Sequence, residues 1–298
     1  MKIVTHTDLD GISCAALFIR KYGKDIKIIY ATVKEAQKIS NKGFTADYTC
    51  DLPKVGNSIN IDHHRSNFEN LKRSNRLTAD DIVDPNVASA TDLVFEKLLF
   101  EGDSIAQEIR RIGHLADIAE LTSEYHSLDI VSRMNSDDPA VLRQISELLA
   151  ENGKLILSST WLQENYRKVQ GVYEKTKKAI EEFLIRPVQL PRILAIDVRQ
   201  ALPNKLVKDI FKPLFSRNVA VVALIYSKSP QEPVRVSFRV AKPEQRFYDV
   251  SKVAMKFGGG GHRMAAACSL TPKDIPETLL QELEEIAKPQ DSIEYLQL

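Results

Sequence analysis

Residues 1–11 read Met-Lys-Ile-Val-Thr-His-Thr-Asp-Leu-Asp-Gly, an apolar stretch that runs out into charged side chains and a glycine. The apolar part predicts a short buried strand, and the glycine predicts a sharp turn into a helix over residues 12–22. Alternate side chains of an extended chain point to the same side. We therefore expect His6, Asp8 and Asp10 to converge as candidate metal ligands if the extended geometry continues that far.

Two further predicted strands also end next to candidate ligands. The strand over residues 46–50 precedes Asp51, and the strand over residues 58–62 delivers His63 and His64. In open parallel α/β sheets, ligands bind in the crevice beyond the carboxyl ends of the strands. Carboxylates mixed with imidazoles suit Mn²⁺, Mg²⁺ or Co²⁺, whereas a closed structural zinc site more often uses thiolates.

These residues resemble the motifs of the DHH phosphoesterase family. In chain order, the resemblance rests on His6-x-Asp8-x-Asp10-Gly11, Asp51, Asp62-His63-His64, Ala116-Asp117, Val236-Ser-Phe-Arg239 and Phe257-Gly-Gly-Gly-Gly-His262. The last two motifs are similar to the DHH-associated C-terminal domain, so the resemblance spans almost the whole chain. One motif alone is a weak signal, and it is their order that indicates the family.

The resemblance implies two divalent ions, with Mn²⁺ expected and Mg²⁺ or Co²⁺ as alternatives. Some members separate the first histidine from its aspartate by three residues, where this chain has one. The implied roles are His6 and Asp8 as ligands of one ion, Asp10, His63 and Asp117 as ligands of the other, Asp51 as the bridging carboxylate, Asp62 as an outer group that orients an imidazole or water, and His64 as a group facing the substrate phosphate.

Such a ligand set favours hydrolysis of a phosphate ester. Two divalent ions a few ångströms apart can share a water, lower its pKa and neutralise charge on the phosphate. No protein nucleophile is then required, and Cys14, Cys50 and Cys268 show no arrangement typical of a catalytic thiol. Asp62 and His64 remain as the candidate catalytic side chains.

The glycine run predicts a loop that binds the rest of the substrate. Consecutive glycines expose backbone N–H groups without side-chain obstruction and can form an anion-binding nest. An arginine on the preceding strand can clamp a second phosphate. The candidate substrate-binding residues are Arg239, Gly259, Gly260, Gly261, His262 and Arg263.

Positive charge is concentrated in the part of the chain that ends with the glycine run. Residues 190–263 contain 14 Lys and Arg against 5 Asp and Glu, although the formal net charge of the chain is only +1. Binding of a long duplex usually requires a more extended basic surface. A short single-stranded RNA or DNA, or a nucleotide, is the favoured partner.

The length of 298 residues exceeds that of a typical single domain, so two are expected. Alternating strands and helices predict a mainly parallel, doubly wound α/β sheet over residues 1–185, ending in a long connecting helix. Two prolines mark residues 186–191 as a linker. Residues 192–298 predict a smaller α/β domain with a mixed sheet.

The sequence shows neither a signal peptide nor an apolar run as long as a membrane span. Three cysteines cannot all pair within one chain, so we expect a protein of the reducing cytosol with no membrane partner. The oligomeric state, including a homo-oligomer, is left open.

We hypothesise a metal-dependent exonuclease that degrades very short oligonucleotides. The alternatives left open are a single-stranded DNA exonuclease, a 3′-phosphoadenosine 5′-phosphate phosphatase, a cyclic-dinucleotide phosphodiesterase and, outside the enzymes, a nucleotide-binding scaffold. Inorganic pyrophosphatases of the family have a different C-terminal domain, so the glycine run argues against that activity.

Overall fold

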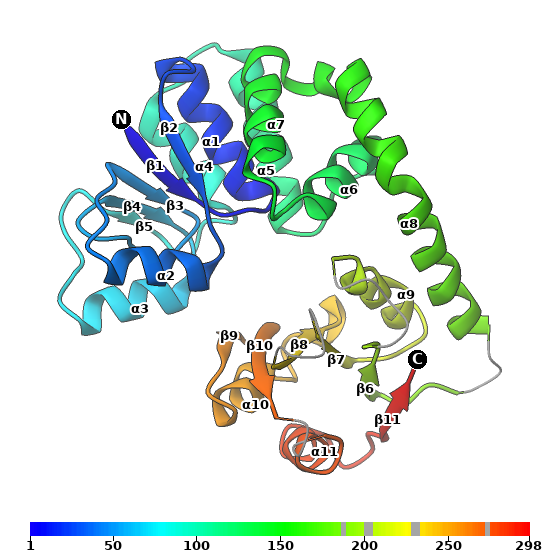
Figure 1. The fold of residues 1–298 in the computed structure, drawn as a ribbon. Helices are drawn as coiled ribbons and strands as arrows, with labels where there is room; N and C mark the ends of the chain where they lie inside the picture. The colour runs from blue at the N-terminus through cyan, green and yellow to red at the C-terminus, as the bar shows by residue number, and fades with distance from the viewer. Residues whose placement is uncertain (186–188, 200–204, 228–232, 272–274) are drawn as a thin grey trace. The chain divides into compact units, whose positions relative to one another are not determined.

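The chain forms two compact units, Met1–Gln170 (unit 1) and Gly171–Leu298 (unit 2) (Figure 1). No helix within the described ranges combines the length and apolar composition needed to cross a membrane. The computed structural model describes residues 1–185, 189–199, 205–227, 233–271 and 275–298.

Helix α8 (Thr160–Ile185) contains the boundary between the two units. Trp161, near its start, packs against the core of unit 1, and Phe183, near its end, packs in a core of unit 2. Ser159 caps the helix, because its hydroxyl oxygen accepts a hydrogen bond from the backbone N–H of Leu162. Of the predicted linker, residues 186–188 fall outside the described part of the chain.

Unit 1 is built on a five-stranded parallel sheet, sheet A, in the order β2-β1-β3-β4-β5. This confirms the parallel α/β sheet predicted from the sequence. Because all strands run the same way, their carboxyl ends share one edge of the sheet. The strands are β1 (Lys2–Thr5), β2 (Lys27–Tyr30), β3 (Tyr48–Cys50), β4 (Ile59–Asp62) and β5 (Ile82–Val83).

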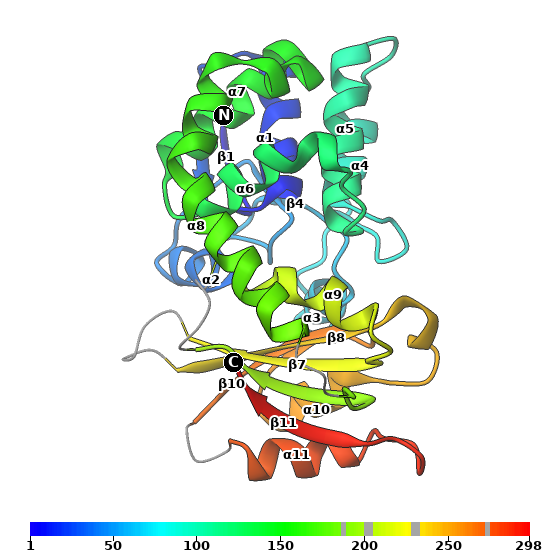
Figure 2. The same ribbon diagram turned by 90° about the vertical axis from the view of Figure 1, so that its right-hand side faces the viewer.

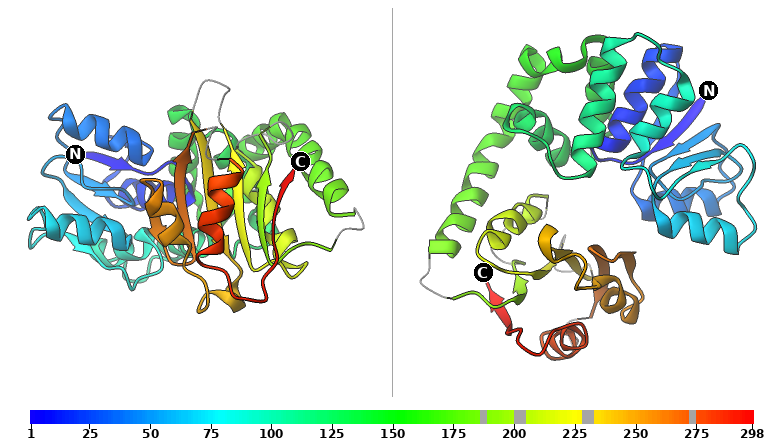
Figure 3. Two further views of the ribbon diagram at one scale, coloured as in Figure 1. Left: turned by 90° about the horizontal axis from the view of Figure 1, so that it is seen from below. Right: turned by 180° about the vertical axis from the view of Figure 1, so that it is seen from behind.

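Helices cover both faces of sheet A, with α2 and α3 on one face and α1, α4, α5 and α7 on the other (Figures 1 and 3). The larger core lies on the α1 side and includes Ile3, Phe18 and Cys50, all fully buried. The helices are α1 (Leu9–Tyr22), α2 (Val33–Asn41), α3 (Arg65–Arg73), α4 (Ala90–Leu98), α5 (Ser104–Asp117), α6 (His126–Met134) and α7 (Pro139–Asn152), with short 3-10 helices η1 (Ser123–Tyr125) and η2 (Gly153–Ser158).

The first helix begins earlier than the sequence predicts. Strand β1 ends at Thr5, and Asp8 caps α1 by accepting a hydrogen bond from the backbone N–H of Gly11 (3.1 Å). The expected extended geometry therefore ends before Asp10. The first turn of α1 sets the direction of the Asp10 side chain instead. A Cβ at residue 11 would lie 2.4 Å from the carbonyl oxygen of His6, so the glycine permits this close approach of the backbone.

Unit 2 contains a six-stranded mixed sheet, sheet B, in the order β11-β6-β7-β8-β10-β9, which confirms the predicted mixed sheet. Helix α9 lies on one face, and α10 and α11 lie on the other (Figure 2). The elements are β6 (Ile193–Asp197), η3 (Val207–Ile210), α9 (Phe211–Phe215), β7 (Val221–Tyr226), β8 (Val234–Val240), η4 (Lys242–Glu244), α10 (Val250–Lys256), β9 (Gly260–His262), β10 (Ala265–Leu270), α11 (Glu277–Glu284) and β11 (Ile293–Gln297).

The glycine run is part loop and part strand, whereas the sequence suggested a loop throughout. Gly260–His262 form β9, an edge strand that pairs antiparallel with β10. A Cβ at Gly259 would lie 2.2 Å from the carbonyl oxygen of Ala267. The absence of side chains lets the edge strand close on β10.

Candidate metal centre

The structure brings together the six candidate metal ligands and the two candidate catalytic side chains of unit 1, in three groups, and within each group the donor atoms lie within 4.8 Å of one another. Their positions follow from the fold: the residues come from the ends of β1, β3 and β4, the start of α1 and the end of α5. The groups are His6, Asp8 and Asp51; Asp10, His63 and Asp117; and Asp51, Asp62, His63 and His64.

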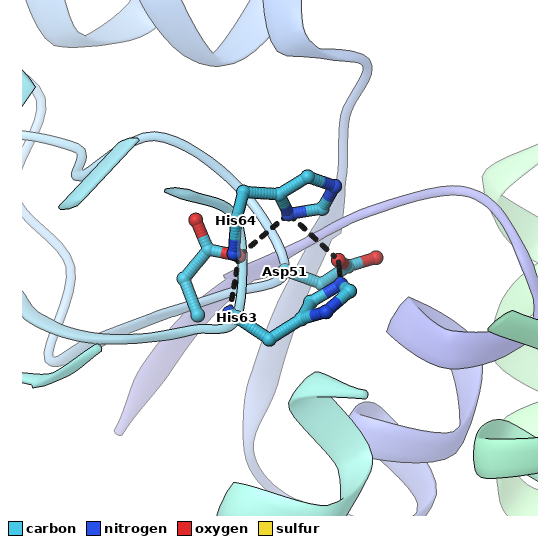
Figure 4. Close-up of side chains that lie close together, drawn as sticks. Asp51, His63 and His64 are labelled. Carbon is cyan, nitrogen blue, oxygen red and sulfur yellow. Dashed lines mark hydrogen bonds and ion pairs between the residues drawn. The ribbon is translucent and has the colours of Figure 1, made fainter. Parts of the chain in front are cut away.

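Asp51 belongs to two of the three groups, and Figure 4 shows its carboxylate beside His63 and His64. Its Oδ2 is 3.5 Å from Nδ1 of His6, and its Oδ1 is 3.6 Å both from Nε2 of His63 and from Nδ1 of His64. The side chain is only 2% exposed. The backbone at Asp51 has a φ of +55°, a left-handed conformation that aspartate tolerates better than most residues.

Two buried atoms of this centre lack a hydrogen-bond partner among the described residues: Oδ1 of Asp51 and Nε2 of His63. The same Nε2 lies 3.6 Å from Oδ2 of Asp117, which is also too long for a hydrogen bond. Buried polar atoms are almost always satisfied, by protein, water or an ion. An imidazole nitrogen and carboxylate oxygens at this spacing fit a divalent cation between them.

Asp62 is fully buried and holds the histidine pair in place. Its Oδ1 accepts hydrogen bonds from the backbone N–H of His63 (2.8 Å) and from Nδ1 of His64 (2.8 Å). Its Oδ2 accepts one from Nδ2 of Asn67 in α3 (2.6 Å). Asn67 is a supporting residue that sequence reasoning missed, because nothing in a lone asparagine within a polar helix signals it.

Asp10, which the sequence predicts as a metal ligand, also contacts the start of α4. Its carboxylate accepts hydrogen bonds from the backbone N–H groups of Ala90 (2.8 Å) and Thr91 (2.9 Å), and from the Thr91 hydroxyl. It therefore fixes the N-terminus of α4, where negative charge is favoured. Because a carboxylate offers about four lone-pair sites, Asp10 keeps acceptor capacity toward a cation.

The crowded carboxylates alter the pKa of their neighbours. Burial alone would lower the pKa of His63, but Asp51 and Asp117 raise it to about 10. Burial would likewise lower the pKa of His6, and Asp8 and Asp51 raise it well above its ordinary value. Burial also raises the pKa of Asp117 to about 6, against the attraction of His63. The carboxylates of this centre therefore favour nearby positive charge. When no metal ion is bound, protons on these side chains provide that charge.

In unit 2, Arg239 and His262 lie on the same face of sheet B. Both are paired with Ala265, so the three residues form one cross-strand row. Paired residues of neighbouring strands point to the same side. The next row on this face contains Gly260 and Ala267, both exposed, so small side chains leave this part of the sheet open. Gly259 and Gly261 flank Gly260 in the same run.

Arg263 contacts the protein's own backbone. Its Nε donates to the carbonyl oxygens of Gln245 (3.2 Å) and Tyr248 (3.1 Å), and its Nη2 donates to that of Arg246 (2.9 Å). It therefore holds the segment before α10 against the turn between β9 and β10. Sequence reasoning did not anticipate this contact, because the carbonyls are fifteen or more residues away in the chain.

Comparison with known proteins finds a matching domain family and relatives that are named oligoribonucleases. Residues 198–288 match the DHHA1 domain. The oligoribonuclease NrnB of Bacillus subtilis is 22% identical over 307 residues, which cover 90% of this chain and 72% of that protein. The bifunctional oligoribonuclease and PAP phosphatase NrnA of Thermus thermophilus is 26% identical over 253 residues, which cover 82% and 68%, respectively.

The fold has a solved counterpart in the pGpG-specific phosphodiesterase PggH of Vibrio cholerae. That structure aligns with a TM-score of 0.65 at 17% identity and covers 96% of this chain and 98% of its own. The ordered motifs, the domain match and these relatives agree. Together they support the assignment of the chain to the DHH phosphoesterase family of enzymes.

Proposed function

We propose that the chain is a metal-dependent phosphodiesterase that hydrolyses short oligonucleotides at the centre in unit 1. The observation that carries this proposal is the pair of buried, unbonded atoms, Oδ1 of Asp51 and Nε2 of His63, in the middle of a cluster of metal-ligand side chains. The names of the relatives support the substrate class, because two are oligoribonucleases and one is specific for the dinucleotide pGpG.

The three groups of donor atoms suggest how the ligands would be divided between two ions. Two divalent ions would lower the pKa of a water and neutralise charge on the phosphate, with Mn²⁺, Mg²⁺ and Co²⁺ all suited to these ligands. The proposed ligands are His6, Asp8 and Asp51 for one ion, and Asp10, His63 and Asp117 for the other, with Asp51 near enough to His63 to serve both.

His64 is the proposed contact to the substrate phosphate. Its side chain is 41% exposed, against 10% for His63, so it is the more accessible of the two imidazoles. Asp62 accepts from its Nδ1 and fixes the orientation of the ring. An imidazole oriented in this way can donate a hydrogen bond from Nε2 to a phosphate oxygen.

Unit 2 provides a second surface for binding anionic groups. Arg239 and His262 stand in one row of sheet B, and the adjacent Gly260 and Gly261 leave the backbone of the edge strand accessible. An arginine, an imidazole and the backbone of an edge strand form a surface suited to a terminal phosphate. Arg263 contributes by holding the neighbouring segment in position.

The test is a hydrolysis assay with labelled RNA dinucleotides to pentanucleotides, long RNA, single-stranded DNA, a cyclic dinucleotide and 3′-phosphoadenosine 5′-phosphate. The proposal expects activity that requires Mn²⁺, Mg²⁺ or Co²⁺, is fastest on the short RNAs and is abolished by chelation. Equal inactivity on every substrate, with and without metal, would instead favour a nucleotide-binding scaffold. Preference for 3′-phosphoadenosine 5′-phosphate would favour the second activity named for the Thermus relative.

A further inference from the structure

A pocket of about 480 Å³ lies between α4 and α5 in unit 1, and no residue of the candidate metal centre lines it. The pocket is open to solvent rather than enclosed, so a ligand can reach its walls. Its polar wall consists of Asp92, Glu96, Gln107, Arg110, Arg111 and His114. Neither the sequence motifs nor the proposed metal chemistry accounts for this combination of side chains.

The centre of the wall is a histidine held by a buried carboxylate. Nδ1 of His114 lies 2.7 Å from Oδ2 of Asp92, whose side chain is only 6% exposed. The same carboxylate accepts hydrogen bonds from Nε of Arg110 (2.7 Å) and from the hydroxyl of Ser89 (2.9 Å). Because Nδ1 is bonded to a carboxylate, Nε2 is the ring atom left for a ligand. The His114 side chain is 39% exposed, so a ligand can reach it.

The pocket and the metal centre are built on the same pair of helices. His114 precedes Asp117 by three residues on α5, and one helical turn rises about 5.4 Å. On α4, the backbone of Ala90 and Thr91 holds Asp10, and the next residue, Asp92, holds His114. A group bound in the pocket would therefore lie about one turn from a substrate phosphate held near Asp117.

The charge of the wall indicates which part of a substrate fits. Arg110 and Arg111 are balanced by Asp92 and Glu96, so the formal charge is zero with a neutral histidine. Arg110 is further neutralised by Glu96, which lies 3.5 Å from its Nη2. A phosphate site would require excess positive charge. A neutral wall that offers both donors and acceptors suits ribose hydroxyls and the edge of a base.

We propose that this pocket binds the nucleoside adjacent to the scissile phosphate, with Nε2 of His114 and the carboxylate of Glu96 as its main polar contacts. This inference rests on the proposed function. It makes His114 and Glu96 specificity residues, which contact the sugar or base and leave the phosphate to the metal centre. The arrangement also explains why a buried aspartate orients a histidine that carries no metal-ligand role.

The test measures binding by calorimetry, with Mn²⁺ present, of a nucleoside monophosphate and of inorganic phosphate. For the unmodified protein, we expect the nucleotide to bind at least about tenfold more tightly than phosphate, as one or two polar contacts to the nucleoside would give. His114→Ala and Glu96→Gln should each reduce this ratio severalfold while phosphate affinity is kept. Lys97→Gln, at an exposed neighbouring position of α4 outside the pocket, should preserve the ratio.

An unchanged ratio in both pocket variants would overturn the inference, as would the absence of any nucleoside increment in the unmodified protein. Glu96 is 64% exposed on a helix surface, so Glu96→Gln keeps the test valid even if His114→Ala disturbs the packing around Asp92. The proposed function has a different point of failure. A protein that shows the expected ratio but hydrolyses no oligonucleotide would retain the pocket assignment and lose the catalytic one.

Discussion

His63 and Asp51 face each other with Nε2 and Oδ1 3.6 Å apart, and neither atom has a hydrogen-bond partner among the described residues. The interval is too long for a hydrogen bond. The left-handed backbone of Asp51 holds its carboxylate at this position, although such a conformation is uncommon for residues other than glycine. The positive φ of Asp51 and the two unbonded atoms support the proposal that this pair binds a cation.

Asp51→Asn removes the charge of this side chain and keeps its shape, so it tests the charge alone. Asparagine adopts a positive φ readily, so the folded structure should persist. Loss of the central carboxylate should reduce metal-dependent hydrolysis by more than about 100-fold, beyond what is typical of residues that only support a ligand. Calorimetric titration with Mn²⁺ should show weakened binding, and circular dichroism should be unchanged. Asp25→Asn, at an exposed site, is the matched control. Full activity of Asp51→Asn would refute the central role of this carboxylate.

The raised pKa of His63 should make metal binding depend on pH. Burial opposes its protonation, but Asp51 and Asp117 raise the pKa to about 10, so the metal-free ring is protonated at neutral pH. A cation binds only the neutral imidazole. Metal affinity should therefore increase as pH rises from 6.5 toward 10, by up to about tenfold per pH unit for one released proton. Titrations in buffers of different ionisation enthalpy would count that proton, and binding without proton release would contradict the assignment.

The same shift has a consequence for the stability of the metal-free protein. The folded-state pKa lies above the unfolded value of 6.5, so the stabilisation is complete below pH 6.5 and disappears as pH rises toward 10. The melting temperature of the metal-free protein should decrease over that range. With saturating Mn²⁺ the decrease should be smaller, because the cation replaces the proton between the same side chains.

Asn67→Ala should show how much the metal centre depends on its support. The substitution leaves Oδ2 of buried Asp62 without its 2.6 Å hydrogen bond. We expect a loss of about 1–3 kcal/mol in the free energy of unfolding and about 10–100-fold in hydrolysis. Asn70→Ala, on the exposed side of the same helix, should change neither quantity appreciably. If the two variants behaved alike in denaturant melts and assays, Asp62 would not need its partner.

The proposed site residues that follow strands could be predicted to lie close together because the sequence signal is local. An apolar run that ends on a charged residue marks the edge of a parallel sheet, and the structure brings Asp51, His63 and His64 together at that edge. The contacts that complete the site could not be predicted in this way. Asp10 contacts a helix terminus about eighty residues further along the chain, and no periodic pattern encodes that docking.

Local geometry also limited two predictions about the backbone. Strand alternation was extended past Thr5, but the helix cap at Asp8 ends the strand geometry there. The glycine run signalled conformational freedom and therefore a loop, yet Gly260–His262 form a strand, because a partner strand with small residues was available across the hairpin. The first outcome depended on the local cap between Asp8 and Gly11, and the second depended on the pairing of β9 with β10.

Arg239→Ala should weaken substrate binding and leave the fold intact. Arg239 and His262 share a cross-strand row of sheet B, so removal of the guanidinium leaves the imidazole as the only cationic or polar side chain of the pairs with Ala265. We expect KM for a short RNA to rise about tenfold, the effect of one lost charge-assisted hydrogen bond, with a smaller change in kcat. Arg235→Ala is a matched control, because Arg235 lies four residues earlier on the same face of β8. Equal effects of the two variants on KM would indicate a diffuse electrostatic contribution rather than a specific contact.

Two adjacent glycines provide a test of the edge strand β9. A Cβ at Gly259 would lie 2.2 Å from the carbonyl oxygen of Ala267 and 2.6 Å from Cβ of Cys268, so the backbone must move. Gly259→Ala should therefore lower the free energy of unfolding by about 1–3 kcal/mol, as overpacking does. A Cβ at Gly260 would meet no atom within 4 Å, so Gly260→Ala should keep the melting temperature nearly unchanged.

Gly260→Ala, the variant that should keep its stability, is the one that should affect substrate binding. The Cβ of Gly260→Ala would stand in the row of Ala267, on the face that carries Arg239 and His262. If that face binds the substrate, the added methyl group should raise KM severalfold without loss of stability. Thermal melts and steady-state assays on both variants would separate the two effects. A Gly260→Ala protein with unchanged KM would show that the substrate does not approach this edge of the sheet.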